Sequence, residues 1–359
     1  MNMKRLFALV LALSGAATLV SCGKQETPTP EPPPVESSVS VIAPVEPEPV
    51  YQFFNPLTGE GCARDISRNR PVAIMLNNHK KAMPQLGVSQ ADIIYELPAE
   101  GGITRMMGLF QSTDGVGSIG TVRSARDYYV SLAFGHDAIF LHAGGSPMAY
   151  DAIQSWGVDA LDCVNGPYEG TLFWRDSWRK KNRGLEHSVL TSGDTISSLL
   201  PTYKRLRLEH PEDFSDALLF DRDQAQGDPA SVLTVVFSNY KTGSFTYDPD
   251  TGLYKVSQYG GPYVDGNTDQ QVAVRNVLVL RTDVGSVKGD DKGRKTLRTT
   301  GEGSGILLRD GVAQEITWHK RKNSTPMYYT DKDGSPVSFG VGHSYINMLD
   351  ESCKVTLQP

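Results

Sequence analysis

The sequence predicts an α/β N-terminal domain with a mixed sheet, followed by a smaller mainly-β C-terminal domain. Over residues 51–211, short apolar runs typical of strands alternate with segments whose apolar residues recur at helical spacing. Over residues 231–359, alternating or β-rich runs are separated by turn residues. Residues 212–230, between these regions, are acidic and rich in turn formers, which indicates a linker.

The first residues have the features of a bacterial lipoprotein signal. A basic start at Lys4 and Arg5 precedes an apolar run of signal-peptide length and then small residues. Leu19-Val20-Ser21-Cys22 has the pattern of a lipobox, in which the cysteine is lipidated and becomes the new N-terminus. We therefore expect residues 1–21 to be a signal peptide and Cys22 to carry a lipid. A plain cleaved signal with an incidental cysteine is the alternative.

Residues 22–50 are expected to form a disordered stalk behind the lipidated cysteine. Prolines recur every few residues, the charge is acidic and large apolar side chains are few, so the segment cannot bury a core. In polyproline geometry, at about 3.1 Å per residue, such a stalk reaches up to roughly 80 Å. The expected location is the extracytoplasmic face of the bacterial cell membrane, with membrane contact through the N-terminal lipid.

The charge of the chain argues against nucleic acid as a partner. The formal net charge is −6, and removal of residues 1–21 with Lys4 and Arg5 takes it to −8. Local basic pockets remain compatible with this charge. Cys62, Cys163 and Cys353 are an odd number at wide spacing, which predicts neither a disulfide framework nor a metal site and leaves open whether one pair forms.

The N-terminal domain alternates predicted strands and helices. The strand-like runs are "PVAIML" (71–76), "ADIIYEL" (91–97), "RMMGLF" (105–110) and "AIFLHA" (138–143). Helical spacing occurs in "SARDYYVSLAF" (124–134), "PMAYDAIQSW" (147–156) and "GDTISSLLPTYKRLR" (193–207). In the C-terminal domain the sequences at 248–252 and 331–334 predict hairpin turns, because their acidic residues lack the spacing of a calcium loop.

Two arginines stand where a glycine-bearing loop is predicted to become a helix, in "GSIGTVRSARDYYVSLA" (117–133). Ser124 and Asp127 form a capping-box pattern, which predicts a helix start at Ala125. Arg123 and Arg126 then lie beside free helix N–H groups that already carry partial positive charge, so a negative partner is required. We expect a bound phosphate or carboxylate. The alternative is a set of salt bridges with Asp127, Glu96 or Glu100.

A second glycine turn follows the strand at 138–143. Gly144-Gly145 leads to Ser146, a good N-cap, and Pro147, which suits the first position of a helix. Such a turn places backbone amides at the carboxyl end of a strand, where α/β sheets usually hold ligands. His142 stands at that edge as a candidate proton donor or anion contact, or as an ordinary core histidine. No hydrolase elbow or phosphate-loop lysine is present in this stretch.

Further candidates are found in "ELPAEGGITR", "FWRDSWRK" and "EHSVLTSGD". Glu96, His142 and His187 are candidate acid/base groups, and Glu96 with Glu100 is alternatively a solvated acidic turn. The expected ligand-binding residues are Arg105, Arg123, Ser124, Arg126, His142, Gly144, Gly145, Ser146, Arg175 and His187. No metal set or cofactor fingerprint was found, so neither a metal nor a cofactor is expected.

Several blocks of this sequence resemble the YerB-like lipoproteins, a bacterial family with paired domains of unknown function. The N-terminal blocks are "NPLTG" (55–59), "RPVAIMLNN" (70–78), "SQADIIYEL" (89–97), "EGGITR" (100–105), "VRSAR" (122–126), "HAGGSP" (142–147) and "FWRD" (173–176). "DGVAQEITWHK" and "DGSPVSFGVGHSYINML" resemble the C-terminal β domain. The resemblance implies a lipid-anchored, two-domain extracytoplasmic protein and implies no reaction. Thr121 stands where the family is expected to have proline, and Tyr263 where histidine is expected.

These observations support three functional hypotheses. The first is a surface lipoprotein that binds an anionic envelope glycan or peptide, or a wall-synthesis protein, through the arginine, histidine and glycine-turn residues. The second is an envelope enzyme for phosphoryl or glycosyl transfer that uses His142 or His187. The third is a structural adaptor in which the β domain presents an edge or apolar patch to a partner. Binding is preferred because no nucleophile, metal set or cofactor motif is recognisable.

Overall fold

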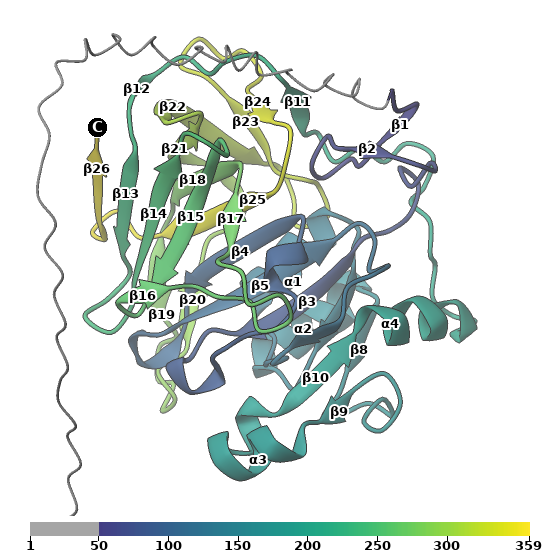
Figure 1. The fold of residues 1–359 in the computed structure, drawn as a ribbon. Helices are drawn as coiled ribbons and strands as arrows, with labels where there is room; N and C mark the ends of the chain where they lie inside the picture. The colour runs from purple at the N-terminus through teal and green to yellow at the C-terminus, as the bar shows by residue number, and fades with distance from the viewer. Residues whose placement is uncertain (1–49) are drawn as a thin grey trace, which may run out of the picture. The chain divides into compact units, whose positions relative to one another are not determined.

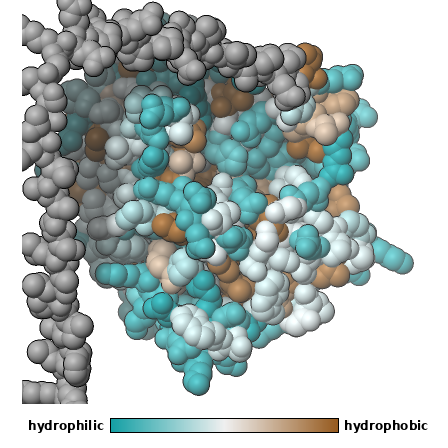
Figure 2. Space-filling view, viewed as in Figure 1, coloured by the Kyte–Doolittle hydropathy of each residue, from teal (hydrophilic) through white to brown (hydrophobic). Residues whose placement is uncertain are grey.

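The structure is a computed structural model that describes residues 50–359. The predicted signal peptide, Cys22 and nearly all of the predicted stalk lie outside the described residues. The described residues form one compact unit. No helix among them is long and apolar enough to cross a membrane. The face shown in Figure 2 is mostly hydrophilic, with small and separate hydrophobic areas.

One 11-stranded mixed sheet runs through both predicted domains (Figure 1). Its order is β12-β22-β21-β18-β25-β4-β5-β3-β7-β8, and β23 pairs with β22. The N-terminal strands are β3 (Val72–Asn77), β4 (Ile93–Pro98), β5 (Thr104–Phe110), β7 (Ile139–His142) and β8 (Ala160–Asp162). The C-terminal strands are β12 (Asp228–Pro229), β18 (Asn276–Arg281), β21 (Gly301–Arg309), β22 (Val312–Lys320), β23 (Tyr328–Thr330) and β25 (Ser344–Leu349).

The central strands of this sheet are buried on both faces. All six residues of β3 and of β25 are buried, and alternate residues enter two different hydrophobic cores. Ala73 and Met75 pack in the core that contains Tyr128 and Tyr129 of helix α1 (Asp127–Gly135). Their neighbours on β3 pack in the core on the opposite face. Continuous apolar runs such as "VAIML" are therefore explained by burial on both sides.

The second core lies between the large sheet and a six-stranded sheet. That sheet is β16 (Gly261–Pro262), β15 (Leu253–Gln258), β14 (Thr242–Asp248), β13 (Val232–Val236) and β26 (Lys354–Gln358), with β17 (Ala273–Val274) paired to β15. Leu233, Val235 and Phe245 meet Val277 and Tyr345 of the large sheet in one cluster. The C-terminal region is mainly β, as predicted, and turns occur at both predicted hairpin positions.

Helices occur only in the N-terminal part of the described chain. They are α1, α2 (Pro147–Trp156), α3 (Ser177–Arg183) and α4 (Gly193–Leu199), with short 3₁₀ turns between elements. A three-stranded sheet joins β6 (Ser118–Gly120), β10 (Val189–Ser192) and β9 (Trp174–Arg175). Three strand pairs complete the fold: β1 (Phe53–Phe54) with β2 (Gly61–Cys62), β11 (Leu219–Asp221) with β24 (Ser338–Gly340), and β19 (Val284–Ser286) with β20 (Lys295–Leu297).

Strand pairing joins the two predicted domains. Strand β25, near the end of the chain, pairs in parallel with β4, so Tyr345 lies opposite Ile94. In Figure 1 yellow β25 accordingly lies between green β18 and the blue strands of the N-terminal region. The predicted linker contains β11 and β12, which pair with strands of the C-terminal domain.

The three cysteines in the described part of the chain are free thiols. Cys163 is buried, whereas Cys62 and Cys353 are partly exposed. Burial, together with the negative charge of nearby Glu169, raises the pKa of Cys163 to about 12. The thiol is therefore held in its protonated, weakly nucleophilic form.

Candidate functional site

Strand β7 ends at His142, and the following residues turn the chain into helix α2. Gly144 has φ of 74°, in the left-handed region that glycine adopts without strain. The Ser146 hydroxyl accepts a hydrogen bond from the N–H of Ala149 at 3.1 Å, and Pro147 is the first helical residue. The predicted strand, glycine turn and capped helix are confirmed.

Asp162, the last residue of β8, holds this turn in place. One carboxylate oxygen accepts hydrogen bonds from the N–H groups of Gly144 at 2.7 Å and Val164 at 2.9 Å, and the other accepts from the Tyr150 hydroxyl at 2.8 Å. Burial alone raises the pKa of Asp162, but these hydrogen bonds and nearby His142 lower it below its usual value. The Gly144 amide is thus already occupied by a protein carboxylate.

Helix α1 begins two residues later than the sequence pattern predicts. Its first residue is Asp127 and its N-cap is Arg126, which makes no side-chain capping bond, so the prediction of Ser124 as N-cap was wrong. The N–H of Ala125 donates to the carbonyl of Gly144 at 2.8 Å, and Ala125 bridges to Gly145. These contacts keep residues up to Arg126 extended. Most of the helix is buried, including Tyr128 and Leu132.

The positive charge of Arg126 is paired with the carboxylate of Glu100. Its Nε donates to Oε1 of Glu100 at 2.5 Å, and Nη2 of Arg105 lies 3.3 Å from Oε2 of the same carboxylate. Burial alone raises the pKa of Glu100, but the hydrogen bond from Arg126 and the charge of Arg105 lower it to about 2. Both guanidinium groups are buried. The salt-bridge alternative therefore describes Arg126, and Glu100 is the acid.

Five of the expected binding residues line one open cavity of about 710 Å³, which we call the Arg123 groove. They are Arg123, Ser124, Gly144, Gly145 and Arg175. Its other lining residues are Val122, Ala143, Tyr150, Val164, Asn165, Gly184, Leu185, Glu186 and Val189. The loop that precedes α1, the turn after β7 and strand β9 therefore meet here. Val164 and Leu185 give the groove an exposed apolar rim.

The two arginines of this groove form ion pairs that are partly open to solvent. Nη2 of Arg123 lies 2.8 Å from Oε2 of Glu186, and Nε of Arg175 lies 2.9 Å from Oε1 of Glu169. The two carboxylate side chains are 59% and 46% exposed. Exposed pairs of this kind contribute only about 0–1 kcal/mol. An anionic ligand can therefore compete with these acids for the guanidinium groups.

The other expected site residues do not line the groove. His142 is buried against Phe140, and its Nδ1 lies 2.9 Å from the carbonyl oxygen of Gly144. His187 is buried, with Nδ1 at 2.8 Å from the Asn77 amide nitrogen, and its ring stacks on His79. Burial lowers the pKa of both His142 and His187. The residues outside the lining are Glu96, Arg105, Arg126, His142, Ser146 and His187.

Glu96 belongs to a buried network between the two predicted domains. Its Oε1 lies 2.9 Å from Nζ of Lys241 and accepts hydrogen bonds from Asn78 and Thr104. Its Oε2 accepts a hydrogen bond from the Tyr345 hydroxyl. The carboxylate is 1% exposed. Because both carboxylate oxygens have partners and the side chain is buried, Glu96 forms a structural ion pair and is not an accessible acid/base group.

Sequence reasoning missed four acidic residues as ion-pair or hydrogen-bond partners in these loops. They are Asp162, Glu169, Glu186 and, as a partner of Arg105, Glu100. Each is a single polar residue in a loop or at a strand end, without a motif of its own. Glu186 stands directly before His187, and its pKa is raised by burial but lowered overall by Arg123. Among residues 50–359, no three His, Cys, Asp or Glu side chains are arranged to hold a metal ion.

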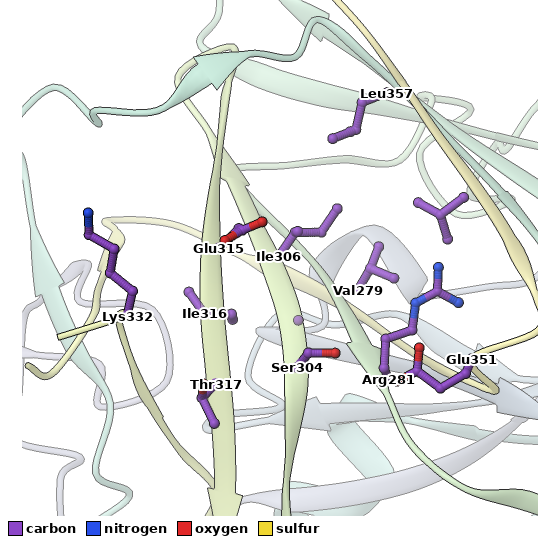
Figure 3. Close-up of a pocket in the computed structure, with 12 residues that line it drawn as sticks. Val279, Arg281, Ser304, Ile306, Glu315, Ile316, Thr317, Lys332, Glu351 and Leu357 are labelled. Atoms are coloured by element: carbon purple, nitrogen blue, oxygen red, sulfur yellow. The ribbon is translucent and has the colours of Figure 1, made fainter. Parts of the chain in front are cut away.

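A separate groove of about 540 Å³ lies in the C-terminal region (Figure 3). Val279 and Arg281 of β18, Ile306 of β21 and Leu357 of β26 contribute to its lining. Figure 3 shows Arg281 and Glu351 close together at one end, and Lys332 apart from them beyond Glu315. Nη1 of Arg281 donates to the carbonyls of Asp350 and Cys353, both at 2.9 Å, so this cation is already engaged.

Comparisons with known proteins agree with the two-part organisation. Residues 57–205 match the family described as "Protein of unknown function (DUF3048) N-terminal domain", and residues 233–346 match its C-terminal domain. The chain is 33% identical over 314 residues to the "Putative lipoprotein YerB" of Bacillus subtilis (strain 168), covering 85% of this chain and 88% of that one. This chain belongs to the DUF3048 family.

A solved structure of a DUF3048 relative shows the same fold. The crystal structure of YerB protein from Bacillus subtilis matches with a TM-score of 0.73 at 31% identity, covering 84% of this chain and 99% of that one. The described chain therefore has the mixed-sheet, two-domain fold of that protein, and the resemblance to the YerB-like family is confirmed.

Tyr263, which stands where histidine was expected, joins the two DUF3048 domains of this chain. It is buried, and its hydroxyl donates to the side-chain carbonyl of Gln85. Nearby, the Asp265 carboxylate accepts hydrogen bonds from the N–H groups of Gly87 at 3.0 Å and Ser89 at 2.8 Å. Both residues therefore make contacts between the matched domains.

Proposed function

We propose that this chain is a lipid-anchored extracytoplasmic lipoprotein that binds an anionic cell-envelope ligand in the Arg123 groove. The lipobox at Cys22 supports the anchor, as does the printed name of the Bacillus subtilis relative, a putative lipoprotein. The observation that carries the binding proposal is the convergence of Arg123 and Arg175 on one open groove from separate segments.

The ligand class follows from the chemistry of the lining. Two guanidinium groups suit a carboxylate or phosphate, which arginine grips through two parallel hydrogen bonds. The exposed apolar side chains of Val164 and Leu185 suit an adjoining uncharged part of the ligand. A carboxylate-bearing peptide fits both features. Ligand binding exchanges the weak pairs with Glu186 and Glu169 for stronger contacts in a more enclosed space.

Binding is favoured over the enzyme hypothesis by the positions of the two histidines. His142 and His187 are both buried and neither contributes to the lining of the Arg123 groove. A general base must come within hydrogen-bond reach of the proton that it removes. Among the residues that line the groove, Glu186 lies next to His187: its carboxylate oxygen Oε1 is 3.5 Å from Nε2 of that histidine.

The test uses the chain from Gly23 onward, which keeps every described residue. We expect soluble muropeptides with free stem-peptide carboxylates to bind in isothermal titration calorimetry. Replacing Arg123 and Arg175 together by Gln should weaken this binding by more than about a hundredfold, since one hydrogen bond to a charged group is lost at each arginine and each contributes about 1.5–3 kcal/mol.

The matched control is Arg64→Gln, which removes an exposed arginine whose ion pair with Asp114 lies outside the groove lining. It should leave the affinity unchanged. Methyl esterification of the muropeptide carboxylates should abolish binding. Equal binding of free and esterified muropeptides, or unchanged affinity in the double variant, contradicts the proposal.

A further inference from the structure

Five exposed cations lie on two short segments of this acidic chain: Lys80 and Lys81, and Lys180, Lys181 and Arg183. None of the five takes part in an ion pair within residues 50–359. This distinguishes them from the four arginines expected as ligand-binding residues, each of which is paired with a glutamate. Uncompensated positive charge on a chain of net charge −6 attracts anions.

Arg179 brings the two cationic segments together. It is buried on α3, and its guanidinium group donates to the carbonyls of Ala82 at 2.9 Å and Pro84 at 2.6 Å. Helix α3 is thereby fixed against the loop that contains the 3₁₀ turn Lys80–Ala82. Lys80 and Arg183 consequently line one cavity of about 270 Å³.

A row of aromatic rings adjoins these cations. The centroids of Tyr259 and Tyr240 are 5.8 Å apart, and those of Tyr240 and His79 are 6.1 Å apart. Tyr240 is 45% exposed. Tyr259 has φ of 55°, an uncommon conformation for a bulky residue, and its hydroxyl donates to the carbonyl of Asn78. The contact fixes the ring at the boundary between the two matched domains.

Two cavities meet at Tyr259. A cavity of about 460 Å³, lined by Tyr240, Thr242, Ser244 and Ser257 among others, shares Lys80, Gln258 and Tyr259 with the cavity described above. The Gln258 side chain is more than nine-tenths buried, and its Oε1 accepts from Nζ of Lys241 at 2.6 Å. Its Nε2 has a thioether contact at 3.9 Å with Met83. Sulfur is a weak acceptor, so this amide keeps donor capacity toward the cavities.

We propose that this surface, the junction site, binds an anionic saccharide. Tyr240 offers an exposed aromatic face for the apolar side of a pyranose ring, Tyr259 lies beside it, and the hydroxyl and amide groups match sugar hydroxyls. Lys80 and Arg183 bind the carboxylate or phosphate of the sugar. The site uses residues other than those of the Arg123 groove: Arg183 lines the junction cavity, whereas Gly184–Glu186 line the groove. It therefore does not rest on the proposed function.

Calorimetric titration of the chain from Gly23 onward tests this proposal with four probes. They are tetragalacturonate, phosphorylated maltotetraose, neutral maltotetraose and tripolyphosphate. We expect at least one anionic saccharide to bind about tenfold more tightly than both the neutral saccharide and the sugar-free anion. The tighter of the two anionic saccharides identifies carboxylate or phosphate as the preferred group. If neither exceeds both controls, the proposal is overturned.

Variants locate the binding. Tyr240→Ala should weaken binding of the anionic saccharide about tenfold, whereas Tyr51→Ala, at a similarly exposed tyrosine, should not. Charge reversal of Lys80 and Arg183 to Glu should abolish binding. The same reversal of Lys204 and Arg205, exposed cations outside both cavities, should leave it within about twofold. The Arg123 and Arg175 double variant should bind the saccharide normally. Equal losses in the test and control variants overturn the junction site.

Discussion

Glu100 is the carboxylate that pairs with two buried arginines of the N-terminal domain, Arg105 and Arg126. It contacts Arg126 and Arg105, and its pKa is about 2 in the folded chain against an ordinary value of 4.5. As the pH falls, the unfolded chain binds this proton first. The stabilisation is therefore complete above pH 4.5 and is lost as the pH falls towards 2, with a magnitude on the order of 3 kcal/mol.

Glu100→Gln should lower the free energy of unfolding at pH 7 and flatten its decline between pH 4.5 and 2. Urea unfolding at a series of pH values measures both effects. Glu169→Gln is the control, because Glu169 pairs with Arg175 near the surface and is 46% exposed. That variant should change the stability by no more than about 1 kcal/mol. If the free energy of unfolding of Glu100→Gln declines between pH 4.5 and 2 as steeply as that of the unsubstituted chain, the assigned role of this carboxylate is contradicted.

The requirement for a negative partner was predictable from the sequence, and Glu100 was one of three candidate acids, but the sequence could not choose among these acids and a bound ligand. Arg126 precedes a helix, where free N–H groups already carry partial positive charge, so an anion had to be present. Glu100 is 26 residues away in a glycine-rich turn, and only the tertiary fold brings it to 2.5 Å. Whether Arg126 is paired with a ligand or with a side chain therefore depends on this tertiary contact.

At the scale of elements, Arg179 fixes helix α3 against the loop after β3. Arg179→Met keeps the length of the side chain and removes the two hydrogen bonds to the carbonyls of Ala82 and Pro84. Each bond from a charged donor contributes about 1.5–3 kcal/mol. We therefore expect faster amide hydrogen exchange in α3 and residues 80–84, with little change in the central strands.

Arg183→Met serves as the control for this experiment because Arg183 is exposed and lies one helical turn further along α3. Its exchange pattern should match that of the unsubstituted chain. Arg179→Met should also weaken saccharide binding at the junction site, since Lys80 and Arg183 lose their common support. Unchanged exchange in α3 contradicts a fixing role for Arg179.

Elements with a local cause were predicted well, and those set by distant contacts were not. The turn at Gly144 and the capped start of α2 follow from residues 142–147 alone, and both are confirmed. The start of α1 was misplaced because Ala125 pairs with the Gly144 region, about twenty residues away. The cationic runs at 80–81 and 180–183 are visible in the sequence, but the buried Arg179 that joins them is not distinguishable from its neighbours.

At the scale of the whole molecule, the two family domains share one sheet. Strand β25 lies between β18 and β4, and is paired in parallel with both. The pairing of residues 344–347 with residues 93–96 has no local signature, which is why the sequence indicates two domains without the sheet that joins them. The buried Glu96–Lys241 ion pair crosses the same boundary.

This connectivity predicts a single cooperative unfolding transition for residues 50–359 in differential scanning calorimetry. Lys241→Met should destabilise the chain by about 3–5 kcal/mol, because it leaves the Glu96 carboxylate buried without its cation. Adding Glu96→Gln should restore part of that loss, since no uncompensated charge remains. Lys255→Met removes an ion pair with Asp248 whose lysine is 48% exposed, and should have a much smaller effect than Lys241→Met. Two separate transitions contradict the conclusion that the domains unfold together through the shared sheet. Equal effects of the two lysine substitutions contradict the conclusion that the buried Glu96–Lys241 pair helps to connect the domains.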